Sequence, residues 1–166
     1  MLDLETMGTS ANAPIIAIGA VSFDRDGVYD EFYQQISLAD NMLHGRKPDA
    51  STIIWWLQQS DDARAAFAQN NHSHQLDITL MAFTDWFNLG RLVEVWGNGA
   101  SFDNAILADA YRSVGLEQPW KFWNDRCYRT VKEMHRHVKL ERVGTHHNAL
   151  DDARSQALHL IKMGVL

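Results

Sequence analysis

The first 36 residues carry the apolar and turn pattern of three consecutive β-strands. Residues 1–5 form a short first strand, and the apolar run at 14–23 is long enough for a buried second strand. Residues 24–27 read Asp-Arg-Asp-Gly, which is a turn signal, and residues 28–36 alternate as a third strand does. We therefore predict an antiparallel meander. Because strands usually contain about 5–6 residues, a first strand that starts at Met1 is either short or is preceded by residues outside this sequence.

The remainder of the chain is dominated by the 3.6-residue periodicity of helices. Between 102 and 114, for example, apolar residues recur at every fourth position, and Gly115 follows them as a terminator. We predict helices at 51–59, after Asp61, at 76–90, 102–114, 129–137 and 147–162, with a short strand at 92–96. This order predicts an α/β sandwich in which the meander lies beside a strand in the middle of the sheet.

Length and composition favour one soluble domain that spans residues 1–166. Apolar residues make up 46% of the 166 residues and charged residues 22%, as in globular proteins. No apolar run approaches the length of a membrane span, and no basic start precedes an apolar signal segment. Cys127 is the single cysteine, which excludes an intramolecular disulfide and favours the cytoplasm.

The net charge of −6 is unevenly distributed along the chain. A basic strip runs from residue 121 to residue 142 and holds Lys121, Arg126, Arg129, Lys132, Arg136, Lys139 and Arg142 against three acids. Such a strip on an acidic body suits a protein whose active site collects carboxylates and whose flank meets phosphates. A solvated helix face carries the same pattern, so the strip alone leaves both interpretations open.

Asp3 and Glu5 are candidate metal ligands on the first strand. Residues two apart on a strand point to the same face, while Leu2 and Leu4 point into the core. Adjacent carboxylates repel unless a cation lies between them, and Mg²⁺ and Mn²⁺ prefer oxygen ligands. Two acids at a strand end that simply face solvent would show the same spacing.

Two later segments supply further acids and a histidine. Asp103 follows a small-residue loop and lies in the first turn of a predicted helix, where an acid also complements the helix dipole. His147 and Asp152 lie at the start of the last helix, where surface histidines and acids are also common. Together, however, the three segments provide the four carboxylates and the base that two-metal phosphodiester hydrolysis requires.

At this point the sequence resembles the DEDD exonucleases of the His-containing branch (DEDDh), which have a ribonuclease H-like fold. The motifs that carry the resemblance are Asp3-Leu4-Glu5 with Thr6-Met7-Gly8, Asn98 with Phe102 and Asp103, and His147 with Asp152. Residues 49–56 and 148–153 are similar to bacterial and prophage proteins of the exodeoxyribonuclease VIII-like or small 3′–5′ exoribonuclease type. The resemblance implies a mixed five-stranded sheet flanked by helices.

The resemblance also implies an activity. It is 3′–5′ exonucleolytic hydrolysis of single-stranded DNA or RNA with two divalent cations, Mg²⁺ or Mn²⁺, which releases nucleoside 5′-monophosphates. Asp3, Glu5 and Asp152 would hold the first ion, Asp3 would also contact the second, Asp103 would act directly or through water, and His147 would be the general base. Relatives are often homodimers. The alternative is a non-catalytic nucleic-acid-binding protein of the same fold, although the complete acid set argues against it.

Two assignments within the last motif have competitors. His146 with Asp151 has the same spacing as His147 with Asp152. At ~100° per residue, Asp152 lies nearer the apolar side of the predicted helix, and Ala153 in the family pattern also favours it. The pairs His72 with His74 and His135 with His137 lie in polar stretches and are expected to be solvated.

We predict that substrate contacts come from Thr6, Met7, Ser51, Trp55 and Phe102. In the family, the position of Met7 tends to touch the terminal base, and methionine suits contact without sequence readout. Trp55 and Trp56 are adjacent on a predicted helix, so we expect one of them to be in the core. The sequence does not distinguish DNA from RNA, because recognition of the 2′-OH depends on a few local contacts.

Overall fold

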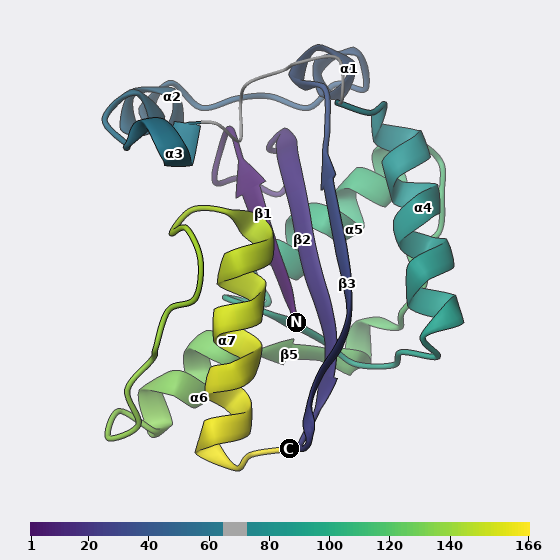
Figure 1. Cartoon of the computed structure of the whole chain (residues 1–166). Coiled ribbons are helices and arrows are strands. Elements are labelled where there is room, and N and C mark those ends of the chain that lie inside the picture. Colours follow the sequence, from purple (N-terminus) through teal and green to yellow (C-terminus); the bar gives the residue numbers. More distant parts are fainter. Residues whose placement is uncertain (65–72) are drawn as a thin grey trace.

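The computed structural model describes residues 1–64 and 73–166 and contains one mixed sheet of five strands (Figure 1). The strand order is β3-β2-β1-β4-β5, with β1 in the middle. Strands β1 (Leu2–Thr6), β2 (Ile15–Asp24) and β3 (Gly27–Gln35) form the antiparallel meander, while β4 (Val95–Gly97) and β5 (Asp125–Cys127) run parallel to β1. The predicted meander and mixed five-stranded sheet are confirmed, and the strand in the middle of the sheet is β1, the first strand of the meander.

Seven helices in the described ranges accompany the sheet. They are α1 (Leu38–Leu43), α2 (Ala50–Leu57), α3 (Asp61–Arg64), α4 (Leu76–Leu89), α5 (Asp103–Ser113), α6 (Tyr128–Met134) and α7 (Ala149–Met163), and a 3₁₀ turn spans Phe122–Asn124. Helix α7 covers one face of the sheet, and α4 and α5 cover the other (Figure 1). Across the described ranges, no helix is long and apolar enough to cross a membrane. His72 lies outside the described residues.

Several predicted boundaries are wrong. The strand expected at 92–96 is β4, which spans only Val95–Gly97, and its three-residue partner β5 was too short to detect from periodicity. Helix α7 begins at Ala149 instead of residue 147 because the Asn148 side chain accepts from the backbone N–H groups of Leu150 and Asp151. Helix α6 ends at Met134, before the predicted end at 137.

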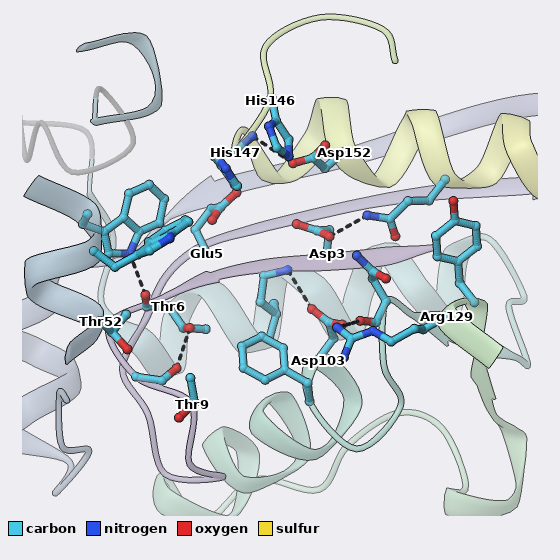
Figure 2. A pocket seen from close by; sticks show the side chains of 18 of the residues that line it. Asp3, Glu5, Thr6, Thr9, Thr52, Asp103, Arg129, His146, His147 and Asp152 are labelled. Carbon is cyan, nitrogen blue, oxygen red and sulfur yellow. Dashed lines mark hydrogen bonds between the residues drawn. The ribbon is translucent and has the colours of Figure 1, made fainter. Parts of the chain in front are cut away.

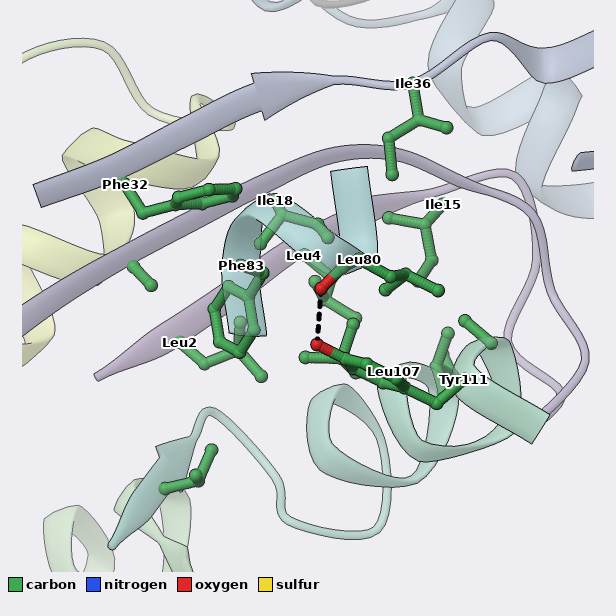
Figure 3. Packing of buried hydrophobic residues seen from close by; sticks show 14 of the residues in the cluster. Leu2, Leu4, Ile15, Ile18, Phe32, Ile36, Leu80, Phe83, Leu107 and Tyr111 are labelled. Atoms are coloured by element: carbon green, nitrogen blue, oxygen red, sulfur yellow. Dashed lines mark hydrogen bonds between the residues drawn. The ribbon is translucent and has the colours of Figure 1, made fainter. Parts of the chain in front are cut away.

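The core between the sheet and helices α4 and α5 contains the inward side of β1. Leu2 and Leu4 are buried there with Phe83 and Leu107, as the alternation of β1 predicts (Figure 3). The hydroxyl of Tyr111 donates to the carbonyl of Leu80 at 2.8 Å and ties α5 to α4 (Figure 3). Asp3 and Glu5 therefore lie on the other face, toward α7.

Glycine at two strand positions lets helix starts approach the sheet closely. A Cβ on Gly19 of β2 would lie 2.1 Å from the carbonyl carbon of Ala149, so only glycine lets the start of α7 rest on β2. A Cβ on Gly97 of β4 would lie 2.2 Å from the Asn104 side-chain oxygen. Because β2 and β4 flank β1, these two contacts bring the first turns of α7 and α5 close to β1.

Candidate active site

A pocket of about 600 Å³ opens where β1, α2, α6 and the starts of α5 and α7 converge (Figure 2). Its volume is typical of ligand sites. The predicted site residues that line it are Asp3, Glu5, Thr6, Ser51, Trp55, Phe102, Asp103, His147 and Asp152. Met7 does not line the pocket; its side chain packs against a small cluster of Ile16, Trp56 and Ala63.

Three carboxylates gather at the floor of the pocket. Asp3, Glu5 and Asp152 are buried, and each offers an oxygen within 4.8 Å of the others. The Gln156 side chain donates to Asp3 Oδ1 at 2.7 Å, and the backbone N–H of His147 donates to Asp152 Oδ2 at 2.9 Å. These bonds fix the carboxylates before any ligand arrives. Arg142 also donates to Asp152 Oδ1, at 2.6 Å.

Asp103 reaches the same pocket from the other side of β1 (Figure 2). Strands β1 and β4 are paired only at Leu2 and Gly97, so the backbone N–H of Leu4 is free to donate to Asp103 Oδ1 at 3.2 Å. Asp103 Oδ2 is buried, and no hydrogen-bond donor contacts it within the described part of the chain. A buried carboxylate oxygen without a donor is costly unless a cation or water meets it.

The electrostatics of Asp3, Glu5 and Asp103 fit a divalent cation. Burial, then the charges of Asp103 and Glu5, raises the pKa of Asp3 well above its usual range. Burial and the charge of Asp152 raise the pKa of Glu5 to about 8, and burial raises that of Asp103 to about 7. Each ionised form would gain from a cation in the pocket, and hard oxygen ligands are those that Mg²⁺ and Mn²⁺ prefer.

Both histidines of the last motif lie at the pocket. The rings of His146 and His147 stack at 3.7 Å, and both offer a nitrogen within 4.8 Å of an Asp152 oxygen. His147 adopts a left-handed backbone conformation, with φ of 65°, and burial lowers the pKa of its ring. Asp151 instead accepts from the Thr145 N–H at 2.8 Å and does not line the pocket.

One of the two adjacent tryptophans is buried and the other is exposed, as expected. Trp56 is 3% exposed and its indole N–H donates to the Thr6 carbonyl at 2.9 Å. Trp55 is 41% exposed, lines the pocket and meets the His147 ring edge-on at 5.0 Å.

Several lining residues were not identified from the sequence. They are Thr9, Tyr128, Arg129, Lys132, Arg142 and Gln156, of which Arg129, Lys132 and Arg142 were known only as members of the basic strip. Helical spacing could have found Gln156, which lies one turn after Asp152. No local pattern indicates Arg142, because it lies in an irregular loop.

A ribonuclease H-like sheet with four converging acids and histidines beside them defines the class of DEDDh 3′–5′ exonucleases. The family model described as the 3′–5′ exoribonuclease Rv2179c-like domain matches residues 1–163. The chain therefore belongs to this family of 3′–5′ exonucleases. Dependence on divalent metal ions follows from membership of the DEDDh family.

Individual relatives agree with this assignment. The chain is 28% identical over 155 residues to an exodeoxyribonuclease of Enterobacteria phage T4, covering 78% of this chain and 68% of that protein. Among solved structures, it is similar to the nuclease domain of 3′hExo, a DEDDh family member bound to rAMP, with a TM-score of 0.62, 15% identity and coverage of 99% and 90%. It also resembles the cell-death related nuclease CRN-4, with a TM-score of 0.59, 15% identity and coverage of 99% and 62%. At this identity the two structures support the fold.

Proposed function

We propose that the chain removes nucleotides one at a time from the 3′ end of single-stranded DNA or RNA and releases nucleoside 5′-monophosphates. The observation that carries the proposal is the group of four buried acids, three of them with raised pKa, around one pocket. Asp3, Glu5, Asp103 and Asp152 would hold two divalent cations, Mg²⁺ or Mn²⁺. When bound, such ions lower the pKa of a bound water and neutralise charge that develops on the phosphate.

His147 is the general base in this proposal. Its lowered pKa keeps the ring neutral at neutral pH, so a ring nitrogen is free to take a proton from the attacking water. The hydrogen bond from its backbone N–H to Asp152 and the contact of its ring with Trp55 hold His147 beside the cluster of acids. His146, stacked on the same ring, is the competing candidate.

The wall of the pocket formed by α2 would receive the terminal nucleoside. Trp55 presents an exposed aromatic ring for stacking, and Thr6 and Ser51 offer hydroxyl groups beside it. Phe102 lines the pocket near Asp103, and Met7 would contribute by packing against the cluster that holds Trp56. The names of the relatives point to both polymers, RNA for the family and DNA for the phage protein, so both belong in the test.

An end-label assay tests the proposal. Single-stranded DNA and RNA, labelled at either the 5′ or the 3′ end, are incubated with Mg²⁺ or Mn²⁺. We expect 5′-labelled strands to shorten stepwise and 3′-labelled strands to release a labelled mononucleotide at once. Binding without cleavage of either polymer would leave the chain a non-catalytic relative and overturn the proposal.

Matched variants then test the residue assignments. Asp152→Asn should lose activity, whereas Asp151→Asn should retain it, because Asp151 lies outside the pocket and an amide oxygen still accepts from Thr145. His147→Gln should lose most activity and keep metal binding. If His146→Gln is the more damaging change, the base is His146.

We also propose that residues 1–166 form a single catalytic domain, that it acts in the cytoplasm and that it forms a homodimer. The family match over residues 1–163 supports one domain, and exposed aromatic residues such as Phe122 and Trp123 offer apolar surface for association. Sedimentation velocity over a range of concentrations tests the dimer; a single monomeric species throughout would exclude it.

A further inference from the structure

Two cations on α6 face the pocket from the wall opposite α2. Arg129 and Lys132 are three residues apart, which places them on one side of α6, and both line the pocket. Figure 2 shows Arg129 on the opposite side of the acidic cluster from the side chains of α2 and Thr6. The pocket therefore has an aromatic and hydroxyl wall, an acidic floor and a basic wall.

Neither of these cations forms an ion pair with an acid within the described ranges. Arg129 donates to the Asn98 carbonyl at 2.7 Å, and the Lys132 ammonium lies 5.8 Å from the centre of the Tyr128 ring. Three other members of the basic strip are paired: Arg126 with Glu94 at 2.6 Å, Arg136 with Glu133 at 2.8 Å, and Arg142 with Asp152 at 2.6 Å. Two positive charges that form no such ion pair are thus directed at the pocket, where they can meet an anionic ligand. Arg129 also lies near enough to Asp103 for its charge to lower the pKa of that carboxyl.

The polarity of the substrate decides which anion this is. The phosphate of the last phosphodiester has the terminal nucleoside on its 3′ side and the rest of the strand on its 5′ side. Only the 5′ side presents further backbone phosphates, each a fixed negative charge. The basic wall of α6 therefore suits the 5′ side of the cleaved phosphate. The aromatic wall of α2 suits the base of the terminal nucleoside.

We propose that Arg129 and Lys132 bind the backbone phosphate immediately 5′ of the cleaved bond. This subsite rests on the proposed exonuclease function and adds to it a direction of the strand across the pocket, from α6 toward α2. It requires no contact with a base, so it serves any sequence and both DNA and RNA. It also assigns Arg129 and Lys132 to substrate binding and leaves the chemistry to the acids and histidines.

Substrates of different length provide the first test. A dinucleoside monophosphate contains the cleaved phosphate alone, whereas a trinucleotide adds the phosphate assigned to α6. We expect Arg129→Gln and Lys132→Gln to lose about 10-fold more in kcat/KM on the trinucleotide than on the dinucleotide, as expected for a charge-assisted contact worth about 1.4 kcal/mol. An equal loss on both substrates would overturn the subsite, since the residues would then act on the cleaved phosphate or on the acids.

Salt dependence of binding provides the second test and does not require cleavage. The dissociation constant of a single-stranded oligonucleotide with an uncleavable 3′ linkage is measured over a salt series in the presence of Mg²⁺. Each variant should reduce the slope of log K against log salt by about 0.7. Arg126→Gln and Arg136→Gln are the controls and should leave the slope unchanged, and Arg129→Lys should restore it. An unchanged slope in Arg129→Gln and Lys132→Gln would refute the subsite even if the wild-type protein is an active exonuclease.

Discussion

Our first prediction concerns Glu5, whose carboxylate is expected to lower the stability of the metal-free fold and yet to be required for function. Its side chain is buried, and its pKa is raised from 4.5 to about 8 by burial and then by the charges of Asp152 and Asp103. In the unfolded chain Glu5 ionises near its usual pKa of 4.5. Between these two pKa values the metal-free fold binds a proton that the unfolded chain has lost, so stability falls as pH rises through this window.

The size of the effect follows from the two pKa values. One pKa unit corresponds to about 1.4 kcal/mol, so at about pH 7 Glu5 destabilises the metal-free fold by roughly 3 kcal/mol. Glu5→Gln keeps the shape of the side chain and cannot ionise. In a chelator, we expect it to melt higher than the wild type by roughly 6–12 °C at about pH 7, and at the same temperature at about pH 4.

Thermal unfolding over this pH range, with and without Mn²⁺, measures both parts of the prediction. Saturating metal should reverse the order of stability, because a ligand at about 1,000 times its Kd stabilises the wild type by about 4.1 kcal/mol, which exceeds the destabilisation by Glu5, and the variant has lost a ligand. Glu117→Gln, at an exposed position, is the control and should change little. A Glu5→Gln protein no more stable than the wild type in chelator at about pH 8 would show that the fold does not raise the pKa of Glu5.

Three further perturbations follow from the packing. Gly19→Ala should destabilise the fold by about 3 kcal/mol or more and reduce activity, because its Cβ would overlap the backbone of Ala149; unfolding in urea that matched the wild type would contradict this close contact. Arg46→Leu should cost about 3–5 kcal/mol, since the buried guanidinium donates to three backbone carbonyls and to Asp109; calorimetry measures this, and a loss below about 1 kcal/mol would show that these bonds contribute little. Trp55→Ala should lower kcat/KM by roughly 5- to 150-fold, the value of stacking one base, and the loss should vanish on a strand with an abasic 3′ end.

The fold was largely predictable because its longest elements have clear patterns. Strand β2 is buried over most of its length and so appears as a continuous apolar run, while helices α4, α5 and α7 bury one face each, so 3.6-residue spacing marks them in the sequence. Strands β4 and β5 have three residues each, and their pairing is set by partners far away in sequence. Local patterns do not contain that information.

The acids of the candidate site were recognised because motifs fix their type and spacing, whereas their environment required the fold. The sequence could place Asp103 at a helix start, but its bond to the Leu4 N–H depends on the divergence of β1 from β4. Likewise, the seven cations of the basic strip look alike in the sequence. Only the fold distinguishes Arg129, which faces the pocket, from Arg126, which is paired with Glu94.

The most direct test of the account is the rate at which Asp3→Asn shortens a 5′-labelled single strand in Mn²⁺. Asp3 lies at the centre of the acidic floor and is held by Gln156, and asparagine keeps one oxygen that can accept this bond. We expect the variant to fold, to bind the strand and to lose at least about 100-fold in rate, the contribution of one group that stabilises charge in a transition state. A variant that releases 5′-mononucleotides at the wild-type rate would contradict the claim that this carboxylate cluster is the catalytic metal site.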